Sequence, residues 1–517
     1  MNNPVAPGRI RWTVLCLAFA ASGLVPAAVE ASPQRVEVIV QMEAGSPPAG
    51  GKAAVRAAGG TVTGDLPIIN GFAAELSSGA AERLTDADGV KAVTVDNAVE
   101  PQGVSLSRLQ TAYPASVDAP QLWNYSDMNV TGRGVGVAVI DTGIAGQHPD
   151  FRTSSSNPAS RVIASAVTNP DARTAGDAYG HGTHVAGIIA GNGWDRRYED
   201  PLRGRYVGIA PDANLISVKV SDDTGEASVL DVIYGLQFVV DNKAAYNIRV
   251  VNLSLESTTV GSYKTDPLNA AVEAAWFKGI VVVTAAGNRG SAEDAVSRAP
   301  GNDPYVITVG AYDDQASNAD GDDSRPAWSS RGVTADGFAK PDIHAPGSGI
   351  VSTLAPGSAF ASMCPTCIVD GQMIRAGGTS MAAPMISGTV ALLLQWFPQL
   401  TPNQVKGMLV RNARLINNRY PAVEAYKTLE AAYYGRTAPV STSGIVPNDL
   451  VNASTGEIDY TRSSWSRSSW STADGGLTAD FARSSWSRSS WSSTDSSGMD
   501  ATRSSWSRSS WSTSWDK

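Results

Sequence analysis

The chain has 517 residues, of which 42% are hydrophobic and 17% are charged, and its net charge at pH 7 is −9. This composition is typical of a folded globular protein and argues against wholesale disorder. The acidic balance argues against a nucleic-acid partner, because a phosphate backbone requires a basic surface. Three cysteines are too few for a disulfide scaffold, and four histidines cannot support a large zinc array.

Residues 1–31 are predicted to be a signal peptide. Arg9 and Arg11 form a short basic region, the apolar run Trp12–Ala21 follows, and small residues lie near Ala31; this is the pattern of a cleavable secretory signal. An uncleaved anchor is the alternative, but the run is shorter than the roughly 20 residues of a membrane span. Because no later segment is apolar and long enough to span a bilayer, we expect a secreted, extracellular protein.

Residues 32–112 are predicted to form a small ferredoxin-like α/β domain. Strand patterns begin near Arg35, Thr61, Gly71 and Val90, and helix-like segments cover 49–58 and 79–87. This is a split β-α-β-β-α-β order. The segment holds no histidine, no cysteine and no serine paired with a base, so alone it indicates no chemistry.

Residues 113–435 are predicted to form a larger α/β domain. Gly134–Ile140, Arg249–Leu255 and Gly279–Thr284 are nearly continuous apolar runs, which is typical of central parallel strands buried on both faces. Helix-like segments precede the second and the third run. This alternation predicts right-handed crossovers and a doubly wound, mostly parallel sheet with helices on both faces.

Residues 436–517 are predicted to be a low-complexity tail, disordered or weakly ordered. The segment 461–471 recurs at 482–492 and 502–512, and each copy doubles Arg-Ser-Ser-Trp-Ser. Exposed tryptophan beside arginine can stack on sugars or pair with other copies. Contact with the cell wall, with glycans or with itself is therefore one hypothesis, and a simple spacer is the other. The tryptophans concerned are Trp465, Trp470, Trp486, Trp491, Trp506, Trp511 and Trp515.

Two polar residues with possible catalytic roles follow buried strands. Asp141 directly follows the first apolar run, and Asn288 follows the third. Sites in parallel sheets form beyond the carboxyl ends of the strands. Taken singly, Asp141 could be a helix cap or loop anchor and Asn288 a turn residue. Beside a nucleophile, Asn288 could donate its amide to a tetrahedral oxyanion.

Three further candidates begin apolar, helix-like segments. His181 and His184 are three residues apart, but no glutamate lies between them as in His-Glu-x-x-His, so metal binding is disfavoured. We expect one histidine to act as a base and the other to pack against the core. Ser380 follows Gly-Gly-Thr at a helix start, where backbone N–H groups favour a developing negative charge. An N-cap role is the alternative for this serine.

Together these segments resemble the subtilisin-like serine proteases, the subtilase family, over about residues 120–432. The motifs that carry the resemblance are Asp141-Thr-Gly143, His181-Gly-Thr-His-Val-Ala-Gly187, Ala286-Gly-Asn288 and Gly378-Thr-Ser-Met-Ala-Ala-Pro384, supported by Gly208-Ile-Ala-Pro211, Trp328-Ser-Ser-Arg-Gly332 and Lys340-Pro-Asp-Ile-His-Ala-Pro-Gly347. Three long motifs in the family's order are highly specific.

The resemblance implies a serine endopeptidase with an Asp-His-Ser triad. In that reading Ser380 is the nucleophile, His181 is the general base and then the acid, and Asp141 orients His181. The Asn288 side chain and the Ser380 backbone N–H would form the oxyanion hole, and His184 would be structural. The chemistry requires no cofactor, and the substrates would be proteins or peptides.

The resemblance also gives the N-terminal domain a role as an inhibitory propeptide. The chain would then be made as a zymogen and would cleave itself between about Glu100 and Ala119. A permanent accessory domain is the alternative. Rival functions for the whole chain are a binding or adhesion protein on a catalytically silent scaffold, and an esterase that uses the same triad.

Two departures from the family pattern bear on the substrate cleft and on calcium. Ser254, Leu255 and Glu256 are expected to line the substrate cleft. After Leu255 the family usually carries glycines, but Glu256 and Ser257 stand here, and the Glu256 carboxylate could favour a basic substrate residue. A solvated loop carboxylate is the alternative for Glu256. Asp150 matches a position that often ligates calcium in the family, while the stretch 184–208 is longer than the compact family form.

The pair Cys364 and Cys367 encloses only Pro-Thr. A redox motif would need a helix N-terminus, and a zinc site would need more ligands. In an exported protein the pair is predicted to form a small local disulfide that stiffens a surface loop.

Overall fold

The computed structural model describes residues 35–43, 45–67, 70–95, 108–123, 129–193 and 196–458, and the backbone of 503–505. The chain divides into two compact units, with the boundary between Gln102 and Gly103. The signal-peptide prediction for residues 1–31 lies outside the described residues, as do most of the tail repeats.

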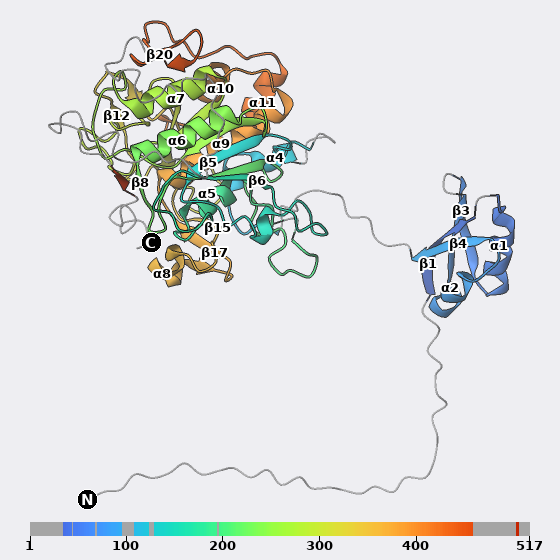
Figure 1. Cartoon of the computed structure of the whole chain (residues 1–517). Coiled ribbons are helices and arrows are strands. Elements are labelled where there is room, and N and C mark those ends of the chain that lie inside the picture. The colour runs from blue at the N-terminus through green and yellow to red at the C-terminus, as the bar shows by residue number, and fades with distance from the viewer. Residues whose placement is uncertain are drawn as a thin grey trace, which may run out of the picture. The chain divides into compact units, whose positions relative to one another are not determined.

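The N-terminal unit is a four-stranded antiparallel sheet with two helices on one face (Figure 1). Its elements are β1 (Arg35–Met42), α1 (Pro48–Ala57), β2 (Thr61–Leu66), β3 (Gly71–Ser77), α2 (Ser78–Leu84) and β4 (Val90–Val95). The strand order β2-β3-β1-β4 confirms the ferredoxin-like arrangement. Alternate residues of the central strands, including Val38, Val40, Phe72 and Ala74, are fully buried beneath the helices.

The second unit is built on a nine-stranded sheet. Its order is β18-β19-β14-β11-β10-β9-β5-β7-β6, and only the β18–β19 pair is antiparallel. The strands are β5 (Gly136–Asp141), β6 (Val162–Val167), β7 (Asn214–Lys219), β9 (Ile248–Leu253), β10 (Val281–Ala285), β11 (Ile307–Tyr312), β14 (Ile343–Pro346), β18 (Arg414–Ile416) and β19 (Tyr420–Ala422). The predicted doubly wound, mostly parallel sheet is confirmed.

Helices cover both faces of this sheet, which explains the uninterrupted apolar runs. Helices α5 (His181–Ala190) and α9 (Thr379–Trp396) pack against each other on one face. Helices α6 (Val229–Asp241) and α7 (Pro267–Phe277) pack together on the other face (Figure 1). Every residue of β5 and of β10 is consequently buried.

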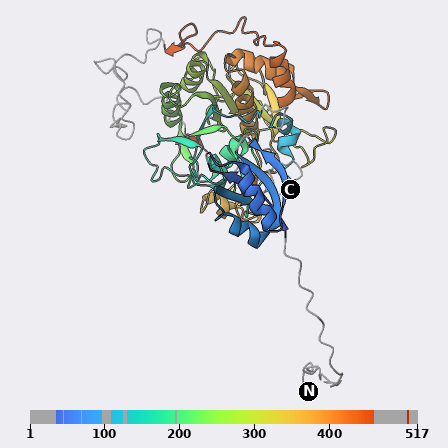
Figure 2. The same ribbon diagram turned by 90° about the vertical axis from the view of Figure 1, so that its right-hand side faces the viewer.

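Shorter elements surround the sheet, and α10 lies beside α11 (Figure 2). They are α3 (Tyr113–Ser116), α4 (Ala119–Trp123), η3 (Pro149–Phe151), β8 (Glu226–Ser228), β12 (Gly332–Val333), β13 (Ala339–Lys340), β15 (Ile350–Thr353), α8 (Ala359–Met363), η5 (Pro365–Cys367), β16 (Ile368–Val369), β17 (Met373–Ala376), α10 (Pro402–Arg411), α11 (Ala425–Tyr433), β20 (Val451–Asn452), β21 (Glu457–Ile458) and β22 (Arg503–Ser505).

The expectation of disorder from residue 436 onward does not hold for 436–458, which pack against earlier residues of the second unit. Asn448 is fully buried, and its side-chain amide donates to the carbonyl oxygens of Tyr263 at 2.5 Å and Asp266 at 2.9 Å. Its backbone N–H donates to Glu273 of α7 at 2.8 Å. These buried polar contacts order a segment that has little apolar pattern of its own.

In the repeat tail the structure describes only the backbone of β22, which pairs antiparallel with β8. Among the described residues, no helix combines the length and the apolar character needed to cross a membrane.

Candidate active site

Three neighbouring strands bring candidate residues to one edge of the sheet. The strands β10, β9 and β5 are adjacent and parallel. Asp141 ends β5, Ser254 follows β9, and Asn288 lies three residues beyond β10. Because the carboxyl ends of parallel strands meet at the same edge, these residues share one region.

Asp141 and His181 form a buried hydrogen bond. The His181 Nδ1 lies 2.7 Å from the Asp141 Oδ1, and both side chains are fully buried. The same carboxylate oxygen accepts the backbone N–H of Thr142 at 2.7 Å. When Nδ1–H donates to the carboxylate, Nε2 becomes the acceptor nitrogen of the neutral ring. The geometry therefore prepares His181 to accept a proton at Nε2.

Asp177 holds the start of α5 and was not identified from the sequence. Its carboxylate accepts the backbone N–H groups of Gly180 at 2.6 Å and Thr183 at 2.8 Å, and the Thr142 hydroxyl at 2.9 Å. Burial raises the pKa of this carboxyl, and the hydrogen bonds from Thr183 and Gly180 oppose the shift. Asp177 thus ties the helix that carries His181 to the residue after Asp141. An acid just ahead of a glycine-rich helix start was the available signal.

The glycine after His181 is required by close packing. A Cβ at Gly182 would lie 2.2 Å from the carbonyl oxygen of Gly143. That space is too small for any side chain, so only glycine lets α5 begin this close to the loop after β5.

Ser380 is the second residue of α9 and is anchored to the loop after β9. Its hydroxyl donates to the Ser254 carbonyl oxygen at 3.2 Å, while the Ser254 hydroxyl donates to the Ser380 carbonyl oxygen at 2.8 Å. The Asn252 amide in turn donates to the Ser254 hydroxyl at 2.9 Å. The helix dipole at this position favours negative charge near the hydroxyl.

The helix packing brings the starts of α5 and α9 to the same place. Both helices begin at the carboxyl edge of the sheet and therefore run in the same direction. The two helices contact each other at Ile189, eight residues after His181, and Gly388, eight residues after Ser380. A Cβ at Gly388 would lie 3.4 Å from the carbonyl oxygen of Ile189. Because the helices run side by side from one edge, the imidazole and the hydroxyl occupy neighbouring helix starts.

Asn288 is oriented by the residue before Ser380. Its Oδ1 accepts the Thr379 backbone N–H at 2.9 Å and the Thr379 hydroxyl at 3.2 Å. With Oδ1 fixed in this way, Nδ2 is the group that can donate to a substrate. A Cβ at Gly378 would lie 3.4 Å from this Nδ2, so a glycine there keeps the approach open.

His184 has a structural environment, unlike His181. Its Nε2–H donates to the carbonyl oxygens of Ile374 at 3.0 Å and Ile350 at 3.2 Å. Burial, followed by the charge of His181, lowers the pKa of His184 to about 3. The ring is therefore neutral at physiological pH.

Phe360 packs edge-on against the His181 ring, with centroids 6.0 Å apart, and was not identified from the sequence.

Glu256 lies beside this site and is paired. Its carboxylate accepts the Arg289 Nε–H at 3.1 Å, and its side chain is 24% exposed. It is therefore not the freely solvated loop carboxylate considered as an alternative. Ser254 and Leu255, just before it, are buried.

The residues around Asp150 do not fit a calcium ion. The Arg196 side chain is fully buried, and its Nε–H donates to Asp150 at 2.5 Å. The same guanidinium donates to Asp200 at 3.0 Å and to Gln372 at 3.1 Å. A cation already neutralises this carboxylate, and no cluster of three or more acidic, histidine or cysteine side chains occurs among the described residues. The longer stretch noted at 184–208 supplies that arginine.

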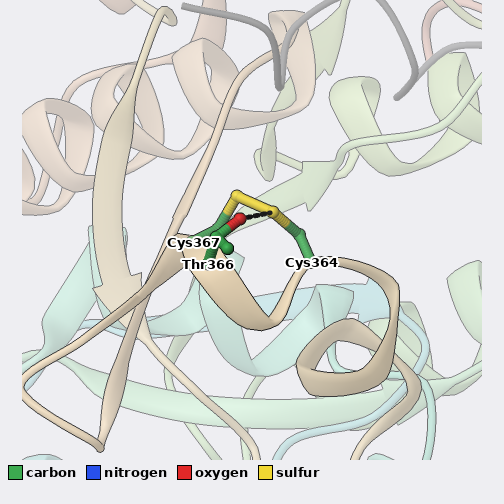
Figure 3. Close-up of a disulfide and its surroundings, with 3 residues drawn as sticks. All are labelled: Cys364, Thr366 and Cys367. Atoms are coloured by element: carbon green, nitrogen blue, oxygen red, sulfur yellow. Dashed lines mark hydrogen bonds between the residues drawn. A yellow bond between two sulfur atoms is a disulfide. The ribbon is translucent and has the colours of Figure 1, made fainter. Parts of the chain in front are cut away.

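The structure places a disulfide between Cys364 and Cys367, with Cα atoms 5.3 Å apart (Figure 3). It spans the short 3-10 helix η5, because Cys364 is its N-cap and Cys367 its last residue. Phe360, which contacts His181, lies in α8 one helical turn before Cys364.

Comparisons with known proteins agree with these observations. The model of the Subtilase family matches residues 132–435, and a model of a peptidase inhibitor domain matches residues 22–96. Serine protease AprX of Bacillus subtilis is 39% identical over 285 residues, which is 54% of this chain and 61% of AprX.

Two further relatives are matched over a larger share of their own length than AprX. Alkaline serine protease ver112 of Corniculantispora psalliotae is 30% identical over 63% of this chain and 72% of its own length. Subtilisin E of Bacillus subtilis is 32% identical over 70% of this chain and 80% of its own length.

Proposed function

Because the chain belongs to the subtilase family, we propose that it is a serine endopeptidase that forms an acyl-enzyme on Ser380. His181 accepts the Ser380 proton at Nε2 while the hydroxyl oxygen attacks the substrate carbonyl carbon. Asp141, hydrogen-bonded to Nδ1, stabilises the imidazolium that results. His181 then gives the proton to the leaving amine.

The tetrahedral oxyanion is stabilised by two donors at one place. They are the Asn288 amide, whose orientation Thr379 fixes, and the Ser380 backbone N–H at the start of α9. Water activated by His181 then hydrolyses the acyl-enzyme and regenerates the serine. No step requires a metal or an organic cofactor, and the Arg196–Asp150 pair argues against calcium at Asp150.

One observation carries this proposal above its rivals. The buried 2.7 Å bond between Asp141 and His181 stands at the carboxyl edge of the sheet, beside the helix start that bears Ser380. A silent binding scaffold has no need to bury an aspartate–histidine pair there. An esterase would use the same groups, and the relative rates with matched peptide and ester substrates distinguish the two.

The test is covalent labelling with a fluorophosphonate, which reacts with activated serines. We expect the mature protein to be labelled and Ser380→Ala to be neither labelled nor active on peptides. The matched control is Ser441→Ala, an exposed serine on the second unit, which should be labelled like the wild type. Full labelling of Ser380→Ala would refute the assignment.

We also propose that the first unit is an inhibitory propeptide released by self-cleavage. The inhibitor-domain match over residues 22–96 supports this role. Tyr113 is buried in the core of the second unit, and Gln110 donates its N–H to the Arg205 carbonyl there. Cleavage is therefore expected between about Glu100 and Gln110. N-terminal sequencing of the secreted form tests this, and a mature start at Ser32 would contradict it.

We further propose export through the signal peptide, with the repeat tail as a contact to cell wall, glycans or itself. Residues 436–458 pack on earlier residues of the second unit. A deletion that removes the repeats and keeps these contacts therefore begins after Ile458. Unchanged retention of that truncated form on cells and glycans would leave the spacer role instead.

A further inference from the structure

The strongest feature not used by the chemistry above is the ion pair between Glu256 and Arg289. We infer that this pair sets substrate specificity, with Arg289 masking a carboxylate that would otherwise select a basic side chain. The inference rests on the proposed endopeptidase function and concerns the substrate residue that supplies the scissile carbonyl.

The pair links the two chain segments that flank the reacting groups. Glu256 lies two residues after Ser254, which exchanges two hydrogen bonds with Ser380. Arg289 directly follows Asn288, the side-chain donor of the oxyanion hole. The pair therefore joins the ends of β9 and β10 immediately beside the nucleophile.

The Glu256 carboxylate lies beside Gly287, the residue that precedes Asn288. A Cβ at Gly287 would lie 2.4 Å from the Glu256 Oε2, so the carboxylate lies directly over this glycine. Gly287 has a φ of +93°, and its N–H donates to the Thr379 hydroxyl at 3.1 Å. A side chain at this position would displace the carboxylate.

A substrate must bring its side chain to this place. Its carbonyl carbon has to reach the Ser380 hydroxyl while its carbonyl oxygen faces Asn288. The side chain of that residue branches one bond from the carbonyl carbon, and so lies between the segments after β9 and β10. Glu256 and Arg289 stand on these two segments.

In the wild-type protein the charges around Glu256 cancel. Arg298 is the other cation that acts on Glu256, and it is itself paired with Asp294 at 2.6 Å. The two ion pairs together carry no net charge. We therefore expect the wild-type protein to show little preference for basic over neutral residues of similar size, despite the carboxylate near Ser380.

Arg289 is the replaceable member of the pair. Its side chain is 41% exposed, against 24% for Glu256, so removing the arginine leaves the more deeply placed carboxylate without its nearest cation. A carboxylate that loses such a partner binds another cation strongly, because a charge-assisted hydrogen bond in a partly buried site is stronger than one between neutral groups. A lysine or arginine of the substrate can supply that cation.

The experiment compares matched peptide substrates that carry lysine or methionine at the acyl position. We expect Arg289→Gln to raise the lysine-to-methionine ratio of kcat/KM about tenfold or more. The double variant Glu256→Gln/Arg289→Gln should return the ratio to the wild-type value. Glu256→Gln alone should lower it, because it leaves an unmasked Arg289 to repel the basic residue.

Cleavage of the methionine peptide reports folding and catalysis in every variant. An unchanged lysine-to-methionine ratio in Arg289→Gln, with that cleavage retained, would overturn the inference alone. A gain that persists in the double variant would also overturn it, since Glu256 would not be its source. Wild-type protein that cleaves neither peptide would refute the proposed function itself.

Discussion

Arg196→Ala should destabilise the second unit strongly, because it leaves a buried carboxylate without a cation. The Asp150 side chain is 1% exposed and that of Arg196 is fully buried. Removing one partner of a buried ion pair typically costs about 3–5 kcal/mol. Arg196 also donates to Asp200 and Gln372, which places the expectation toward the upper half of that range.

The corresponding fall in melting temperature follows from the size of the unit. With an unfolding entropy of about 2.1 cal/mol/K per residue over roughly 300 residues, 4 kcal/mol corresponds to a fall of about 6 °C. The measurement is thermal unfolding in the Ser380→Ala background, which prevents self-digestion during heating. Arg133→Ala is the matched control, because Arg133 pairs with Asp212 while 73% exposed, and it should change stability by less than about 1 kcal/mol.

The same experiment tests the calcium question. We expect a chelator to leave the melting temperature of the parent protein unchanged, since Arg196 already neutralises Asp150. A fall of under about 1 °C for Arg196→Ala would refute the argument. So would a chelator-induced fall in the parent protein that added calcium reverses and that Asp150→Asn abolishes.

Three other predictions follow from the site and from the buried titratable groups. Asp141→Asn should lower kcat on peptides by about 10⁴-fold with little change in KM, because the amide favours the wrong histidine tautomer; activity within tenfold of wild type would contradict this. Burial lowers the pKa of His184 to about 3 and that of His344 to about 4, so between these values and 6.5 the unfolded chain binds more protons. The contribution of these two histidines to the free energy of unfolding should be fully present above pH 6.5. Below that pH the free energy of unfolding should fall by about 1.4 kcal/mol per pH unit for each histidine; a urea-denaturation midpoint that stays constant from pH 7 to 5 would count against it. Burial, and then Asp303, raises the pKa of Glu273 well above its usual range, so the folded chain holds an extra proton above pH 4.5 and loses stability as the pH rises. Glu273→Gln should therefore raise the melting temperature at pH 9 more than at pH 5, and an equal effect at both would exclude this origin.

The sequence was sufficient for the elements whose local pattern agrees with the fold. Continuous apolar runs predicted β5, β9 and β10, and their polar ends located Asp141 and Asn288. The glycine-rich starts of apolar helices located His181 and Ser380. In each case a buried strand or helix constrains the residue types on both sides of the functional one, so the signal is local.

The contacts that cross the chain could not be read from it. Arg196 reaches Asp150 from an insertion 46 residues away, and Arg289, after β10, reaches Glu256, after the neighbouring strand β9. Asn448 is ordered by carbonyl oxygens far earlier in the chain. Single charged or polar residues on loops have many possible partners, and only the fold selects one of them.

The catalytic roles of Asp141, His181 and Ser380 are tested by a crystal structure of the mature protein with a peptide boronate or fluorophosphonate bound. We expect a covalent bond to the Ser380 Oγ, with His181 between Asp141 and that oxygen. The oxyanion of the adduct should lie within about 3.1 Å of the Asn288 Nδ2. Ser380 unmodified, or modified but turned away from the His181 Nε2, would show that these three residues do not act as a triad.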